Sequence, residues 1–327
     1  MRIFFPPSGD DLRRFCALPG LGDLDPETVC RHAPDALLLD EEAGTPVGRA
    51  SLWWRTAPNY GDERVGLIGH YAVVDGVAAS RILEAACALL ADNGCTLAVG
   101  PMDGSTWRRY RLLTERGTEP TFFLEPDNPD DWPGHFERAG FRGLAHYYSA
   151  RCADLGTMRT ADAVALRLRK YGFTVRPIDL ARIDSELTTL WSLATDAFAD
   201  NFLYTPIAEE EFRAMYMALL PVLLPELVLI AEHEGRAVGF GFAVPDVMQA
   251  RRGLPVDTLV FKTIGVAKCM NRRGIGKWIF DCTLQAARTL GFQSAIYALI
   301  HADNPSGRLA HPSGRDFRRY TLFARKL

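Results

Sequence analysis

The chain has 327 residues, of which 48% are hydrophobic and 24% are charged, and its formal net charge is −3. This length is typical of about two globular domains. The small net charge gives no reason to expect nucleic acid or an anionic membrane as a partner, and no apolar run approaches the ~18 residues of a membrane span. Pro6 and Asp10 interrupt the first apolar stretch too early for a signal peptide.

The seven cysteines lie far apart in the chain, with no C-x-x-C pair. An odd, scattered set of this kind is typical of reduced thiols in a cytoplasm, and not of a disulfide framework or a zinc site. We therefore expect a soluble, cytoplasmic protein without a metal.

Apolar periodicity predicts alternating strands and helices in the first half of the chain. The predicted elements are a hairpin (36–40 and 47–55), a strand (64–74), a helix that ends at Gly94, a strand (96–102), a short helix (132–141) and a strand (144–152). A long aromatic segment, 104–125, lies before the short helix. Connections of this length are usually functional or serve as packing arms. The segment either reaches across to a substrate site or packs the two halves together.

The same order of elements starts again after a small, polar stretch at 155–161. The predicted elements are a strand (173–178), two helices (180–196 and 208–219), a hairpin (226–246), a strand (257–266), a helix that ends at Gly291, a strand (294–304) and a final strand (318–327). This repetition predicts an α/β (α+β) protein of two similar domains, 1–155 and 165–327. Each would be a mixed, mostly antiparallel sheet flanked by helices.

Two glycines, Gly274 and Gly276, stand where the last long helix begins. Glycine costs about 1 kcal/mol against alanine inside a helix, so its use here indicates that something approaches the backbone closely. The free amides and the positive dipole end of a helix start favour an anion. The spacing excludes a Rossmann turn, because Ile279 replaces its third glycine. It also excludes a Walker loop, because Asn271 replaces its first glycine and Trp278 its Ser or Thr.

The pattern resembles the pyrophosphate loop of the GNAT superfamily of acyl-CoA-dependent N-acyltransferases, Q/R-x-x-G-x-G/A. The corresponding stretch here is Asn271-Arg272-Arg273-Gly274-Ile275-Gly276. The stretches 263–266 (TIGV) and 301–304 (HADN) resemble the central strand of that superfamily and the strand after it. Two departures stand out: Asn replaces the usual Gln or Arg at 271, and PSGRLAHPSGRDF replaces the usual tyrosine-bearing helix.

The resemblance implies that acetyl-CoA, or another acyl-CoA, binds to the second half as a cosubstrate. Amides from Arg272 to Lys277 would hold the pyrophosphate, the backbone of β-strand residues 264–266 would pair with the pantetheine arm, and Asn304 would contact its other side. The residues implied in cofactor binding are Ile264, Gly265, Val266, Asn271, Arg272, Arg273, Gly274, Ile275, Gly276, Lys277 and Asn304.

The first half departs from this pattern. The helix-ending glycines are 291 − 94 = 197 residues apart, and at that offset Val77 and Ala79 replace the two loop glycines. A β-branched Val77 would crowd the amides where a pyrophosphate would lie. We therefore expect a degenerate GNAT-like domain with a structural or substrate-shaping role. A second, unorthodox CoA site in this half is the open alternative.

The resemblance further implies acyl transfer to the primary amine of a small molecule or a peptide, by alignment, proton removal and oxyanion stabilisation. His301, at the end of a predicted strand, and Tyr320 are the candidate catalytic residues. Histidine suits a base because its ordinary pKa is near ~6.5. Glu232 is a weaker candidate, and catalysis through ordered water stays open.

The segment 196–212 is expected to form the acceptor wall, with Phe198, Phe202 and Tyr204 as its apolar side chains. The sequence does not indicate the acceptor or the oligomeric state. Two further hypotheses remain beside the N-acyltransferase: a non-catalytic acyl-CoA sensor and a purely structural two-domain protein.

Overall fold

The computed structural model describes residues 1–5, 9–18, 24–157, 162–304 and 314–327. The strands are β1 (Arg2–Phe4), β2 (Ala36–Glu42), β3 (Thr45–Trp53), β4 (Val65–Val73), β5 (Leu97–Gly100), β6 (Leu112–Glu115), β7 (Arg142–Cys152), β8 (Phe173–Pro177), β9 (Val228–His233), β10 (Arg236–Pro245), β11 (Thr258–Val266), β12 (Ser294–His301) and β13 (Arg315–Lys326). The helices are α1 (Gly9–Ala17), α2 (Pro26–His32), α3 (Gly76–Asp92), α4 (Trp132–Arg138), α5 (Asp162–Lys170), α6 (Ile183–Phe198), α7 (Glu209–Met217), α8 (Met248–Arg251) and α9 (Ile275–Thr289).

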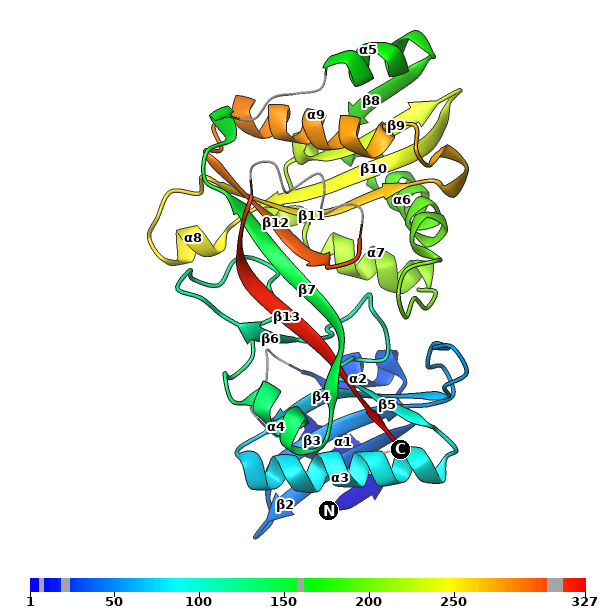
Figure 1. The fold of residues 1–327 in the computed structure, drawn as a ribbon, viewed down its shortest axis with the longest axis vertical. Helices are drawn as coiled ribbons and strands as arrows, with labels where there is room; N and C mark the ends of the chain where they lie inside the picture. Colours follow the sequence, from blue (N-terminus) through cyan, green and yellow to red (C-terminus); the bar gives the residue numbers. More distant parts are fainter. Residues whose placement is uncertain (6–8, 19–23, 158–161, 305–313) are drawn as a thin grey trace.

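The strands form one mixed, mostly antiparallel sheet flanked by helices (Figure 1). Their order is β1-β2-β3-β4-β5-β13-β7-β12-β11-β10-β9-β8, and β6 pairs with β13 outside this path. Two pairs, β4–β5 and β11–β12, are parallel. The expected α/β class, with a mixed and mostly antiparallel sheet, is confirmed. We call β1–β6 and α1–α4, with the segments that connect them, the first region, and β8–β12 with α5–α9 the second region.

The two regions are joined edge to edge by β7 and β13. The sequence predicted both strands but not this pairing. The last strand of the chain, β13, lies between β5 and β7, and β7 lies between β13 and β12. Figure 1 shows these two strands as a long twisted ribbon that runs from one region to the other. Each region therefore borrows a strand from the other part of the chain, so the sheet is continuous and not two separate sheets. The division into domains 1–155 and 165–327 stays a prediction.

The position of α9 depends on two glycines in β10, Gly239 and Gly241. Residues Ile275 and Ile279 on α9 are buried against this strand. A Cβ added at Gly241 would lie 2.6 Å from Cγ2 of Ile279, and one at Gly239 would lie 3.0 Å from its Cδ1. Since no side chain there separates the two elements, the helix lies close on the sheet. This close contact fixes the start of α9 beside the end of β11.

Candidate active site

The strands β11 and β12 part halfway along their length. Their parallel pairing extends from Thr258↔Ser294 to Phe261↔Tyr297. Beyond this point β11 continues to pair with β10 on its other side, as far as Gly239↔Val266. Similarly, β12 continues to pair with β7. The inner edges of the two strands therefore open away from each other, and their backbone groups face the space between them.

A cavity of about 990 Å³ fills this opening. Its walls come from the open ends of β11 and β12, from α6 and α7, and from the aromatic segment 104–125. The lining includes Phe198, Phe202 and Tyr204, which places these side chains where an acceptor wall was expected. It also includes charged groups, among them Arg111, Glu125 and Lys262. The cavity therefore combines aromatic and aliphatic walls with many polar and charged groups.

The segment 104–125, which we call the arm, both lines this cavity and packs the two regions together. Trp107 Nε1 donates a hydrogen bond to the carbonyl of Thr205 at 2.9 Å. Arg108 makes a two-pronged ion pair with Glu211 on α7, at 2.6 and 2.9 Å. The arm therefore reaches the cavity and also packs the two regions together. In this way the first region contributes side chains to a cavity of the second.

The start of α9 offers unsatisfied backbone amides. Gly274 has a φ of +90° and is the N-cap residue, and no side chain within the described residues caps the helix. The first helical hydrogen bond runs from the amide of Trp278 to the carbonyl of Gly274 at 3.0 Å. The preceding carbonyl, of Arg273, accepts from Nη2 of Arg167 on α5 at 2.8 Å. The helix start therefore has the backbone amides and the dipole end that favour an anion, and the sequence did not suggest the cation of Arg167 beside it.

The other residues implied in cofactor binding lie around this helix start and along β11. Ile264 and Asn304 line the cavity, and Gly265 is buried on β11. The position of a Cβ at Gly276 would be 3.5 Å from Ile264 Cγ2 and 3.6 Å from Val266 Cγ2. Asn271, Arg272 and Arg273 are exposed, Val266 is half-buried and Ile275 is buried. The side chain of Lys277 is engaged within the helix, because its ammonium forms an ion pair with Asp281 one turn along α9.

His301 lines the cavity, but its hydrogen bonds limit what it can do. Its Nδ1 accepts from the amide of Asp303 at 3.1 Å. In the neutral ring the hydrogen therefore resides on Nε2, which is buried and has no partner among the residues that the structure describes. Burial lowers the pKa of His301 below its ordinary value. The ring lies beside Tyr147 and Phe202. The lone pair of His301 is thus engaged by a backbone amide and its Nε2 hydrogen is buried, and its role as a catalytic base stays a prediction.

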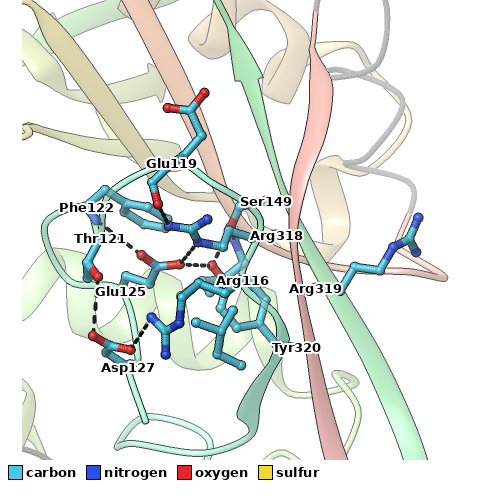
Figure 2. Close-up of polar contacts among 12 residues, drawn as sticks. Arg116, Glu119, Thr121, Phe122, Glu125, Asp127, Ser149, Arg318, Arg319 and Tyr320 are labelled. Carbon is cyan, nitrogen blue, oxygen red and sulfur yellow. Dashed lines mark hydrogen bonds and ion pairs between the residues drawn. The ribbon is translucent and has the colours of Figure 1, made fainter. Parts of the chain in front are cut away.

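Tyr320 lies outside the cavity lining, in a buried polar network (Figure 2). Its hydroxyl donates to Glu125 Oε1 at 2.6 Å and lies 3.2 Å from Ser149 Oγ. Burial and the nearby Glu125 raise the pKa of Tyr320 far above its ordinary value. Its role as a catalytic acid stays a prediction, but its hydroxyl hydrogen is engaged in the hydrogen bond to Glu125. The weaker candidate Glu232 pairs with Arg176 and is not part of the lining.

The same network holds a buried ion pair between the arm and β13. Arg318 Nε and Glu125 Oε1 are 2.9 Å apart, and both side chains are 0% exposed. The amide of Phe122 donates to the other carboxylate oxygen at 3.2 Å. Burial raises the pKa of Glu125 in spite of these partners. Because its carboxylate is already bonded on both oxygens, we assign Glu125 to the framework of the cavity wall.

Lys262 is the polar cavity residue that sequence reasoning missed. Its Nζ donates to the carbonyl of Leu124 on the arm at 3.2 Å. The side chain is partly accessible from the cavity yet surrounded by protein, and this burial, with Arg111 nearby, lowers the pKa of Lys262 to about 7. The signal was present in the sequence as one lysine in an apolar strand, DTLVFKTIGV. No group of three or more His, Cys, Asp or Glu that could hold a metal is found within the described residues.

The corresponding place in the first region is closed. The carboxylate of Asp75 caps α3 by accepting from the amides of Val77 and Ala78 at 2.9 and 2.8 Å. The amide of Met102 donates to the carbonyl of Ile68 at 2.7 Å, which bridges the point where β4 and β5 would part. The expected reason for the difference needs correction, because Val77 is 62% exposed and does not crowd the amides. A carboxylate of the chain itself binds the amides at this helix start.

No helix among the residues that the structure describes is long and apolar enough to cross a membrane. No protein-family model matches the chain. A bacterial ceramide synthase from Caulobacter vibrioides is 28% identical over 274 residues, which cover 77% of this chain and 71% of the relative.

Two solved structures share the fold. A GCN5-related N-acetyltransferase from Anabaena variabilis has a TM-score of 0.56 at 11% identity, and the match covers 99% of this chain and 73% of that one. The GCN5-related glucosamine N-acetyltransferase region of a fungal multi-domain β-N-acetylglucosaminidase has a TM-score of 0.51 at 16% identity, over 89% of this chain. This chain spans 33% of that longer protein. The chain thus has the fold of the GCN5-related N-acetyltransferase superfamily.

Proposed function

We propose that the protein transfers an acyl group from an acyl-CoA to the amine of an amphiphilic, long-chain acceptor. The observation that carries the proposal is the opening between β11 and β12, which leads from an uncapped helix start to a cavity of about 990 Å³. The helix start suits the pyrophosphate, and the open edge of β11 suits the amide groups of pantetheine.

The cosubstrate would lie along a continuous path. The amides of Arg272 to Lys277 would bind the pyrophosphate, with Arg167 and Arg273 as nearby cations. The backbone of 264–266 would pair with pantetheine as an added strand does, and Asn304 would contact its other side. The thioester would then reach the point where the strands part, beside Lys262.

Two observations support a long-chain acceptor over a polyamine or an amino acid. The cavity is at the upper end of the ~300–1000 Å³ range of ligand sites, and much of its lining is aromatic or aliphatic, as at Phe198, Phe202 and Tyr216. The relative from Caulobacter vibrioides is named a ceramide synthase, and a ceramide is a long-chain amino alcohol acylated on nitrogen. The acyl group itself, acetyl or longer, is part of the proposal to be tested.

The test is turnover with defined substrates. The protein is incubated with acetyl-CoA or a long-chain acyl-CoA, and with a long-chain 2-amino alcohol, an amino sugar, a polyamine or a peptide. The released thiol of CoA is measured with a colorimetric thiol reagent, and the N-acyl product by mass spectrometry. We expect an amide with the long-chain amino alcohol.

Each other outcome selects a different function. CoA binding without any product would favour the acyl-CoA sensor. No binding of CoA at all would leave the structural protein. Product formation that is unchanged in Gly276→Val would place the cosubstrate elsewhere and contradict the proposed path.

A further inference from the structure

Lys262 stands where β11 and β12 part. The last paired residues of the two strands are Phe261 and Tyr297, so Lys262 is the first residue of β11 beyond the pairing. It is also the extra residue of a β-bulge, because Ala243 pairs with Phe261 and the next pair is Phe242 with Thr263. Bulges re-aim side chains and are common beside active sites. Here the bulge coincides with the inner end of the cavity, whose lining includes Lys262.

The amine of Lys262 is held by a neutral partner. Its Nζ donates to the Leu124 carbonyl at 3.2 Å, and no carboxylate within the described residues forms an ion pair with it. Leu124 has a φ of +63°, which is strained for a residue with this side chain. A turn holds this conformation, since the amide of Glu125 donates to the carbonyl of Phe122 at 3.2 Å. The arm thus presents a neutral carbonyl to the amine, while its nearby carboxylate, Glu125, forms its ion pair with Arg318.

The other candidate bases near the cavity are already bonded. Nδ1 of His301 accepts from a backbone amide, and the hydroxyl proton of Tyr320 is donated to Glu125. Both oxygens of Glu125 accept hydrogen bonds, one of them in the ion pair with Arg318. Among these groups, Lys262 alone both lines the cavity and, as a neutral amine, has a nitrogen lone pair that no hydrogen bond occupies.

We propose that the amine of Lys262 takes the proton from the attacking acceptor nitrogen during acyl transfer. This inference rests on the proposed function. As the acceptor nitrogen forms its bond to the thioester carbonyl carbon, the N–H proton moves to Nζ of Lys262. The C–S bond then breaks, and the thiolate of CoA leaves. The proton on Nζ passes to this thiolate, which gives the thiol and restores the neutral amine.

The electrostatic surroundings favour the neutral amine that this role requires. Burial is the main cause of the lowered pKa of Lys262, about 7, and the positive charge of Arg111 acts in the same direction. The negative charge of Glu125 opposes both. His301 and Tyr297 are the titratable groups that line the cavity from β12. Since a lowered pKa means that the amine is neutral above about pH 7, activity should rise as the pH passes upward through this value.

The first experiment is a pH profile of the wild type, Lys262→Gln and Lys262→Arg. Glutamine keeps a donor for the Leu124 carbonyl, and arginine keeps a donor and a charge, but neither can accept a proton. We expect kcat/KM to fall roughly 10²–10³-fold in both variants, with CoA affinity unchanged, as for loss of a general base. The rise near pH 7 should disappear in both. Lys326→Gln, an exposed lysine far from the cavity, is the matched control and should behave as the wild type.

Two further measurements distinguish proton transfer from a structural role. A weakly basic amine gives a more acidic N–H when it attacks, so it loses its proton to water more easily, and the defect of Lys262→Gln should shrink with such an acceptor. The chain contains five lysines: Lys170, Lys262, Lys268, Lys277 and Lys326. In the protein labelled with ¹³C at the lysine Cε, one resonance should titrate near pH 7 and be missing in Lys262→Gln.

The outcomes separate the two claims. If the wild type makes product and Lys262→Gln keeps its rate and pH profile, this inference is wrong and the proposed function stands. A Lys262 resonance that titrates like the other four lysines would also overturn it. If the wild type binds CoA but makes no amide with any acceptor, the proposed function fails, and the inference fails with it.

Discussion

The two regions of the molecule follow one plan, and they differ in what satisfies the same backbone groups. In each, a helix connects two parallel strands in the chain, and this helix starts shortly after the first of the two strands ends. In the first region Asp75 caps the helix and Met102 bridges the strands. In the second region the helix start is Gly274, no side chain of the described residues caps it, and the strands part over a cavity. One carboxylate and one backbone hydrogen bond therefore satisfy, in the first region, the backbone groups that the second region leaves open, with the fold retained.

The regions also depend on each other. The arm of the first region supplies the Leu124 carbonyl and Glu125 to the cavity of the second. In return, β13 completes the sheet of the first region. The closed region is therefore a wall of the open site, which fits the substrate-shaping role expected from the sequence.

The largest effect should come from breaking the buried ion pair that ties the regions together. Glu125→Ala leaves Arg318 buried without its carboxylate, which typically costs about 3–5 kcal/mol. We expect the free energy of unfolding, measured with urea, to fall by this amount in one transition shared by both regions. Glu63→Ala removes an exposed pair with Lys326 and should change the stability little. Separate transitions for the two regions would show that they do not fold as one unit.

The next effect concerns the open helix start. Gly274→Val is unsuitable because the φ of +90° strains any side chain there, with or without a ligand. Gly276 has no such strain, and a valine would extend toward Ile264 and Val266, where the cosubstrate is proposed. We expect Gly276→Val to fold and to lose CoA affinity at least about 100-fold, or ~2.7 kcal/mol.

The matched control for this variant is in the closed region. Gly76 is the first residue of α3, and a Cβ there would meet Arg138 at an ordinary 3.6 Å. Gly76→Val should therefore leave CoA binding unchanged in titration calorimetry. Equal losses in the two variants would mean that the regions are not as different as the geometry indicates.

A smaller effect is expected from removing the internal cap. Asp75→Ala should lower the free energy of unfolding by about 1 kcal/mol, the usual cost of a lost N-cap, and Asp75→Ser should restore most of it. Neither variant should gain a second CoA site, because the hydrogen bond from Met102 to Ile68 still closes the strands. Appearance of a second site in calorimetry would show that Asp75 alone closes the region.

The smallest effect belongs to the exposed charge beside the loop. Arg273→Ala should weaken CoA binding by less than about tenfold, because an exposed charge contributes at most ~1 kcal/mol and is screened by salt. The difference from the wild type should vanish at high ionic strength. Arg288→Ala, at the far end of α9, is the control. A loss as large as that of Gly276→Val would mean that side chains, and not amides, hold the anion.

The sequence predicted the elements of the site better than their assembly. The apolar face of α9 and the glycines at its start are local patterns, so the helix and the place where it begins could be predicted without a structure. The place of β13 between β5 and β7 was not, because the alternation of a strand does not specify its neighbour. Tyr320 and Lys262 illustrate the same limit. Each is one polar residue in a strand, and only the fold decides which is buried in a network and which faces the cavity.

The account is tested most directly by the number of CoA molecules that bind to one chain. Calorimetric titration of the wild-type protein should give one site per chain, which disappears in Gly276→Val and persists in Gly76→Val. Two equivalent sites, or a single site that survives Gly276→Val, would contradict the distinction between an open and a closed region.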